Sequence, residues 1–297
     1  MRRPTSTVRT GGPALVAALV CTTLLLWSGG ARSDVPLYEA TVPLGGPTEQ
    51  DRARALAEAL QVVAVKASGR RAAASNGTVA AADPTRYVQR YAKTADQGLK
   101  VGFDGRAVEE LLQQAGLPLW PSERPLTVVS AAGADRAAIE RAAAGRGLPI
   151  VWGPGGSGAH ATLSGAPGAT GFVWTFTHAG QTTEARGSAQ DGIHLAADTL
   201  AAYYAPSSTR TTSSISISVG GMRDFTAYAG LVDYLRSLSL VRDVAVEALT
   251  GDVVRLRLTM RGDRDLLVRI VALDARLQPS ASVDAPAEAG VDFLFQP

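Results

Sequence analysis

The chain has 297 residues, near-equal numbers of basic and acidic side chains, and one cysteine, Cys21. Its formal charge is +2, but Met1 to Ser33 hold four arginines and no acid, so the remaining 264 residues carry a formal charge of about −2. A near-neutral chain without a basic stripe lacks the pattern of a nucleic-acid binder. The residues after Ser33 contain no cysteine, which excludes a disulfide and a thiol nucleophile there.

The N-terminal segment, Met1 to Ser33, has the pattern of an export signal. Three early arginines precede the apolar stretch Ala14 to Trp27. That stretch is shorter than the roughly 20 apolar residues that span a membrane, so we expect a cleaved signal peptide. Small residues place the cut after Ala31 or after Ser33, and a retained inner-membrane anchor is the alternative.

Residues 34–122 have the pattern of a small N-terminal α+β module. Thr48 suits a helix N-cap, and the acid at Asp51 suits the positive end of the helix. Asp96-Gln97-Gly98 lies between two strand-like runs and indicates a hairpin, and Asp104 precedes apolar residues at helical spacing. The predicted order is strand, helix, strand, strand, helix, over residues 37–43, 49–67, 86–93, 99–103 and 105–115.

Five segments resemble one family of exported bacterial proteins. They are Val62 to Arg71, Arg86 to Tyr91, Leu99 to Phe103, Gln114 to Trp120, and Arg124-Pro125. In these segments the chain is similar to the DUF2066 family, whose function is unknown. The resemblance covers Leu37 to Tyr204 and, more loosely, the C-terminal unit, and it is strongest in the block from Gly116 to Pro125. It implies a periplasmic bacterial protein, and it brings no catalytic or binding residues with it. The segment between Trp152 and His160 is shorter here than in that family.

Residues 123–206 predict a central α/β module. A strand, an alanine-rich helix and a second strand in succession favour a crossover with parallel strands. Phe172, Trp174 and Phe176 alternate onto one face, as a sheet buried on one side requires. The predicted strands are 126–130, 148–152, 161–163, 172–178 and 182–187, with helices at 135–144 and 192–204. The polar segment Ser207 to Ser214 is interpreted as a linker.

Residues 215–297 predict a C-terminal α+β module. Asp224 precedes a helix with apolar residues at helical spacing, and Thr250-Gly251 joins two strands. In the second of these strands apolar and polar residues alternate, which predicts one buried and one wet face. The predicted strands are 215–219, 243–249, 252–260 and 291–295, and the second helix is 264–275. The order repeats that of residues 34–122, and the sequence leaves a duplication open.

Three histidines, His160, His178 and His194, are the main candidates for catalysis. None has a partner at a metal-ligand spacing, and no G-x-S-x-G nucleophile motif is present in the sequence. His194 and Asp198 are four residues apart on a predicted helix, which favours a surface pair. The glycine-rich segment 155–158 is followed by no Lys-Ser/Thr of the kind found in phosphate-binding loops, so we interpret it as a turn. We therefore predict no catalytic residue, metal or cofactor.

Two features are candidates for interaction with a partner. Trp120, with Arg124 after it, follows a helix stop in a loop, where a tryptophan either anchors a partner or packs between modules. Arg255 and Arg257, together with Arg261, belong to the polar face of the last hairpin. That face either meets an anionic surface, such as lipid headgroups or peptidoglycan carboxylates, or is simply solvated.

These patterns together predict a non-enzymatic protein of the cell envelope that acts by contact with an envelope protein or a cell-wall component. An unrecognised periplasmic hydrolase is one alternative, and it requires a cleft with a nucleophile beside one of the histidines. A small-ligand carrier is another, and it requires an enclosed apolar pocket. No transmembrane helix is expected after cleavage, and the oligomeric state is left open.

Overall fold

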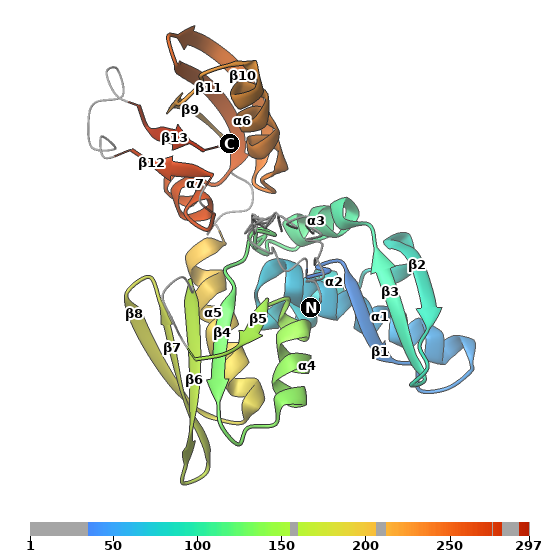
Figure 1. Ribbon diagram of the computed structural model, residues 1–297. Coiled ribbons are helices and arrows are strands. Elements are labelled where there is room, and N and C mark those ends of the chain that lie inside the picture. Colours follow the sequence, from blue (N-terminus) through green and yellow to red (C-terminus); the bar gives the residue numbers. More distant parts are fainter. Residues whose placement is uncertain (1–34, 155–159, 206–211, 275, 281–290, 297) are drawn as a thin grey trace, which may run out of the picture. The chain divides into compact units, whose positions relative to one another are not determined.

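The computed structural model describes residues 35–154, 160–205, 212–274, 276–280 and 291–296. Residues 33–297 form one compact unit. Its described part contains three sheets with helices packed beside them (Figure 1), which confirms the expected mixed α and β fold class. The predicted signal peptide, the glycine-rich segment 155–158 and residues 207–211 of the expected linker lie outside the described residues.

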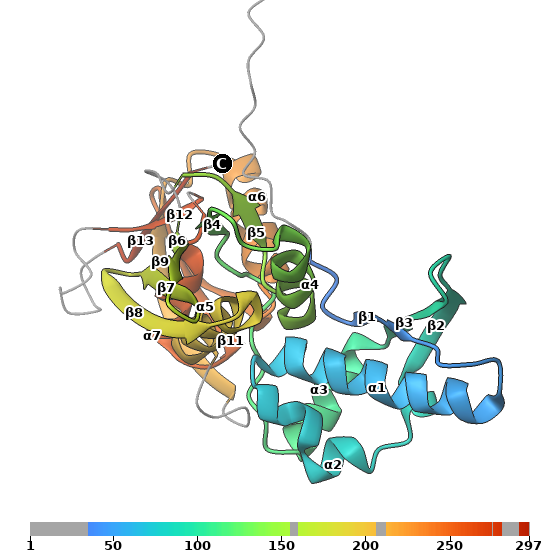
Figure 2. The same ribbon diagram turned by 90° about the horizontal axis from the view of Figure 1, so that it is seen from below.

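The N-terminal sheet has the strand order β1-β3-β2 and is antiparallel throughout. The helix α1 packs against β1 and β3, with α3 and α2 beside it (Figure 2). The predicted order of the longer elements is confirmed, and the alanine-rich connection adds three short helical turns. The elements are β1 (Glu39–Pro43), α1 (Glu49–Ser68), η1 (Arg71–Ser75), α2 (Gly77–Ala80), η2 (Pro84–Arg86), β2 (Val88–Lys93), β3 (Gly98–Phe103) and α3 (Gly105–Gln114).

Both ends of α1 follow from the residues that flank it. The Thr48 hydroxyl accepts a hydrogen bond from the amide of Asp51 at 3.1 Å, and the Asp51 carboxylate accepts one from the Thr48 amide at 3.3 Å. This reciprocal pair is a capping box. Gly69 ends the helix with a φ of +68°, a left-handed conformation that glycine adopts without steric cost.

The central sheet has the strand order β5-β4-β6-β7-β8. The pair β4 and β5 is parallel, as predicted from the crossover. The ring of Trp174 is fully buried and lies between Gly165 and Gly192, where any larger residue would meet its atoms. The elements are β4 (Thr127–Ala131), α4 (Arg136–Arg146), β5 (Ile150–Trp152), β6 (Ala161–Gly168), β7 (Gly171–His178), β8 (Gln181–Gly187) and α5 (Ala189–Tyr204).

The C-terminal sheet has the strand order β10-β11-β9-β13-β12. β9 begins at Thr212, inside the segment expected to be a linker, because Thr212, Ser213 and Ser214 pair with β11. β12 was not predicted, and α7 ends at Val271, earlier than expected. The elements are β9 (Thr212–Gly220), α6 (Phe225–Ser237), β10 (Val241–Thr250), β11 (Val253–Arg261), α7 (Arg264–Val271), β12 (Leu277–Pro279) and β13 (Phe293–Phe295).

In the described part of the chain, most of the buried apolar residues belong to two clusters. One belongs to the N-terminal sheet and its helices and includes Leu60, Val63 and Val101. The other runs without interruption through the central and C-terminal sheets and includes Trp174 and Leu256. The central and C-terminal modules therefore share one core, while the N-terminal module has a core of its own.

None of the helices in the described ranges is both long enough and apolar enough to cross a membrane.

Candidate functional site

Three arginines join segments that are far apart in the sequence. Arg146 and Arg261 are buried, and Arg124 is partly buried. We call them the junction arginines. Each one donates hydrogen bonds to backbone carbonyls at or just beyond the C-terminal end of a helix, where carbonyl oxygens lack intrahelical partners and the helix dipole is negative.

Arg124 connects the ends of α1 and α4. Its Nη2 donates to the carbonyl of Lys66 at 2.6 Å, and its Nη1 donates to the carbonyl of Gly147 at 2.6 Å. The guanidinium also lies 3.8 Å from the ring centroid of Trp120. Desolvation by burial lowers the pKa of Arg124 to about 9, so the side chain keeps its charge at neutral pH.

Trp120 belongs to the same junction. Its exposed fraction is 3%, and its amide donates to the carbonyl of Ala67 at 2.8 Å. Of the two roles considered for Trp120 and Arg124, the structure places both in packing between modules. The Trp120 ring is buried, and Arg124 is partly buried beside it.

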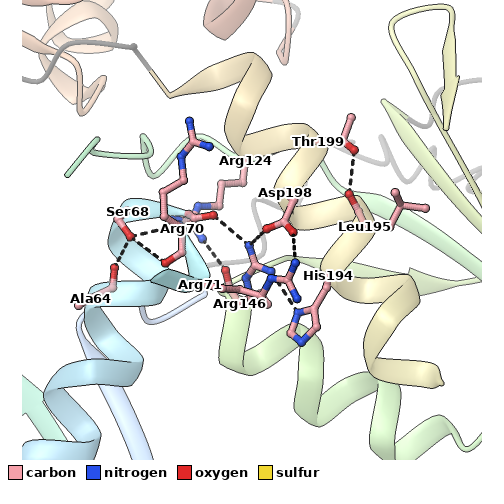
Figure 3. A network of polar contacts seen from close by, with 11 residues as sticks. Ala64, Ser68, Arg70, Arg71, Arg124, Arg146, His194, Leu195, Asp198 and Thr199 are labelled. Atoms are coloured by element: carbon pink, nitrogen blue, oxygen red, sulfur yellow. Dashed lines mark hydrogen bonds and ion pairs between the residues drawn. The ribbon is translucent and has the colours of Figure 1, made fainter. Parts of the chain in front are cut away.

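Arg146 lies between the end of α1 and the helix α5 (Figure 3). Its Nη2 donates to the carbonyl of Gly69 at 2.9 Å and to the Asp198 carboxylate at 2.6 Å, and its Nη1 lies 3.1 Å from Nδ1 of His194. The exposed Arg71 pairs with the other oxygen of Asp198 at 3.0 Å. His194 and Asp198 were expected to form a surface pair, but both instead bind a buried arginine that is about fifty residues earlier in the chain.

Arg261 also lies inside the protein, although strand alternation placed it on the wet face of the last hairpin. Its Nη1 donates to the Glu109 carboxylate of α3 at 3.0 Å, and its Nη2 donates to the carbonyl of Ser239 at 2.7 Å. Glu109 also accepts a hydrogen bond from the hydroxyl of Tyr38 at 2.7 Å. The contact is with a residue 152 positions away, which strand alternation cannot reveal.

Arg255 and Arg257 remain on the exposed face of β11. Arg257 pairs with Glu247 of the neighbouring strand, and its Nε donates to that carboxylate at 2.6 Å. The ion pair neutralises part of the positive charge on which attraction to an anionic surface would depend. Arg255 lies beside Ala248 and Ser218 in the ladder.

The histidines other than His194 have different surroundings. His178 is buried against Tyr203 and Tyr204, and its Nδ1 lies 2.6 Å from the carbonyl of His160. Burial lowers the pKa of His178. His160 is exposed. Within the described ranges, no group of three or more His, Cys, Asp or Glu side chains is arranged to hold a metal ion.

Sequence reasoning missed three exposed apolar residues on the C-terminal module, Phe225, Val246 and Leu249. Their exposed fractions are 80%, 50% and 64%. We call these three residues the C-terminal apolar surface. Val246 pairs with Leu256 and Leu249 pairs with Val254, so both share the sheet face of those core residues.

Phe225 lies at the same end of the module as Leu249. It is the first residue of α6, and the amide of Met222 just before that helix donates to the carbonyl of Asp252 in the β10–β11 turn at 2.9 Å. Helical spacing groups Phe225 with the apolar residues of α6, but its side chain is 80% exposed.

β10 is an edge strand and is interrupted twice. The register shifts between Val241 and Asp243 and again between Val246 and Ala248. The inserted residues, Arg242 and Glu247, are both charged. Bulges and charges on an edge strand oppose pairing with a strand from another chain. The C-terminal apolar surface is therefore better suited to side-chain contacts than to sheet extension.

A small cleft in the N-terminal module has a volume of about 200 Å³. Its lining includes Leu44, Pro47 and Leu99, with Tyr91, Arg52 and Lys93 among the polar and aromatic contributors. Typical ligand pockets measure about 300–1,000 Å³. The cleft is smaller than the pocket that a carrier of drug-sized ligands requires.

Comparison with known families gives one match. Residues 31–121 match a family described as a domain of unknown function, DUF8605. The expected resemblance to DUF2066 is therefore wrong, because the matched family is a different one. The block from Gly116 to Pro125, which suggested that resemblance most strongly, is the connection that holds Trp120 and Arg124 in the junction. Neither a curated protein nor a solved structure matches the chain.

Proposed function

We propose that this chain is an exported, non-enzymatic protein of the bacterial cell envelope that acts by contact with another envelope protein. The pattern of Met1 to Ser33 supports export, and a periplasmic location follows from it as part of the proposal. The C-terminal apolar surface supports the contact role. The partner is expected to present an apolar patch of its own.

The observation that carries the proposal is the exposure of Phe225 and Leu249. Exposed apolar side chains that occur singly need no explanation, but a phenylalanine and a leucine exposed at the same end of one module favour an interaction site. Aromatic anchors often provide a large share of the binding energy at such sites.

The junction arginines support the same role. Their charged groups, and those of Glu109, Asp198 and His194, are engaged in holding the modules together. A scaffold whose parts are fixed by such contacts presents its exposed surface in one geometry, which lowers the cost of ordering on binding.

In-cell crosslinking of the tagged protein, followed by mass spectrometry, tests the proposal. We expect one envelope protein to be enriched reproducibly, and we expect Phe225→Ser combined with Leu249→Ser to abolish the enrichment. Tyr91→Ser and Val151→Ser remove exposed apolar side chains on the other two modules and serve as matched controls. Equal capture by the double variant and the wild type would contradict the proposed surface.

Two further measurements test the remaining parts of the proposal. Osmotic-shock fractionation with N-terminal sequencing should find the chain in the periplasm, starting at Arg32 or Asp34. A purified protein that hydrolyses a cell-wall peptide, and loses this activity in His194→Asn, would replace the contact role with that of a hydrolase.

A further inference from the structure

The contact between Arg146 and His194 requires a particular protonation state. Arg146 is 2% exposed, and a guanidinium has only donor groups. Its Nη1 lies 3.1 Å from His194 Nδ1, so Nδ1 must be the acceptor and the ring must be neutral, with its proton on Nε2. The arginine is charged, so the histidine is the member of the pair that can titrate near neutral pH.

We propose that the Arg146–His194 contact makes the junction between the N-terminal module and the central module sensitive to acid. A proton on Nδ1 would point a donor at the Nη1 donor and would place two positive charges side by side. The imidazolium would then be drawn to Asp198, one turn further along α5, and would compete with Arg146 for that carboxylate. This inference is independent of the proposed docking role.

The charged groups around His194 come from three elements. Arg146 lies on α4, Arg71 lies on η1, and Asp191 and Asp198 lie on α5. Burial lowers the pKa of His194 first, and the two arginines lower it further, whereas the two aspartates oppose them. The ring is therefore neutral at pH 7 and above, and the junction is intact there. Protonation takes place below the ordinary value of 6.5.

Protonation of His194 affects the N-terminal module through the contact between Arg146 and Gly69. Arg146 donates to the Gly69 carbonyl with the same Nη2 that binds Asp198. A shift of Asp198 towards a charged His194 also weakens its pair with Arg71. Arg146 and Arg71 therefore both lose a partner in the same protonation step. The contacts of Arg124 do not involve His194 and are expected to persist as a tether.

Paired spin labels on the full chain test the proposal. Glu58→Cys lies on α1 and Ala137→Cys lies on α4, both exposed, and Cys21→Ser removes the native thiol. Double electron–electron resonance should give one narrow distance distribution at pH 8. At pH 5 a second distance should appear, with a larger population than at pH 8, because protonation of His194 weakens the contacts of Arg146. The midpoint should fall below pH 6.5.

His194→Asn is the decisive variant, because an asparagine oxygen can occupy the position of Nδ1 without titrating. It should keep the narrow distribution at both pH values. His160→Asn changes an exposed histidine outside the junction and should behave as the wild type does. A wild-type distribution that is the same at pH 8 and pH 5 would overturn the proposal, as would a His194→Asn chain with the wild-type transition.

Hydrogen exchange provides a second measurement that needs no variant. The amides of residues 70–73 should lose protection between pH 8 and pH 5, after correction for intrinsic exchange, while those of β11 should not. Uniform loss across both segments would indicate global acid unfolding and would refute a local junction switch.

Discussion

Gly69 offers a direct test of how closely the N-terminal and central modules pack. It combines a φ of +68° with very little space. A β-carbon placed there would lie 2.5 Å from the Cβ of Ala201 on α5 and 2.9 Å from the Trp120 ring. Neither neighbour is the flexible end of a side chain, so Gly69→Ala forces the backbone or the tryptophan to move.

The expected loss has two parts. The left-handed conformation costs a non-glycine residue about 1–2 kcal/mol, and the reduced freedom of the unfolded chain offsets about 0.4–1 kcal/mol of this. Overpacking of a close-packed site adds about 1–3 kcal/mol. We therefore expect Gly69→Ala to lower the free energy of unfolding by about 2–4 kcal/mol.

Gly116→Ala is the matched control. Gly116 has nearly the same φ, +69°, but a β-carbon there would meet nothing within 4 Å. It should lose about 1 kcal/mol, from conformation alone. Urea unfolding followed by tryptophan fluorescence gives both values. Equal losses in the two variants would show that the modules do not touch at Gly69 as described, and would refute the argument.

Two further predictions concern the cores of the central and N-terminal modules. Gly192→Ala places a β-carbon 2.3 Å from the buried Trp174 ring. Although alanine favours a helix, we expect overpacking to lower the free energy of unfolding by about 1–3 kcal/mol. An unchanged urea midpoint would contradict the packing of α5 on β7. Lys66 is buried, and desolvation lowers its pKa from 10.5 to about 8. Between these two pH values the unfolded state therefore binds more protons than the folded state. Stability should then rise with pH above about 8. In Lys66→Met that rise should be absent when unfolding is measured between pH 7.5 and 8.5, below the pKa of Arg124, and a rise equal to that of the wild type would assign it to another group.

Local patterns in the sequence predict most of the fold. Thr48, Asp104 and Asp224 cap helices as the sequence indicates, because a cap depends on only a few neighbouring residues. The alternation of Phe172, Trp174 and Phe176 likewise reports a sheet face. Such signals fail for β12, which has three residues and no alternation to detect.

The contacts between modules could not be predicted in this way. Arg261 occupies a strand position that faces outward by alternation, and it is buried only because Glu109 and Ser239 lie against it. Arg146 meets Asp198 and Gly69 across 52 and 77 residues. Nothing in the residues around an arginine indicates whether another module will cover it. The structure therefore directs attention to buried arginines at the junctions in place of the surface arginines Arg255 and Arg257. The exposed aromatic candidate is Phe225 and not Trp120.

The choice of arginine at the junctions has a physical reason. Burying a charge without partners costs several kcal/mol, so each junction needs acceptors that are themselves short of donors. The C-terminal carbonyls of α1 and α4, and the Ser239 carbonyl just beyond α6, meet this need. A lysine has a single donor group on a flexible stem, whereas the planar fork of Arg124 reaches two helix ends at once. A module border in this chain is thus stabilised where a helix ends, by an arginine from another segment.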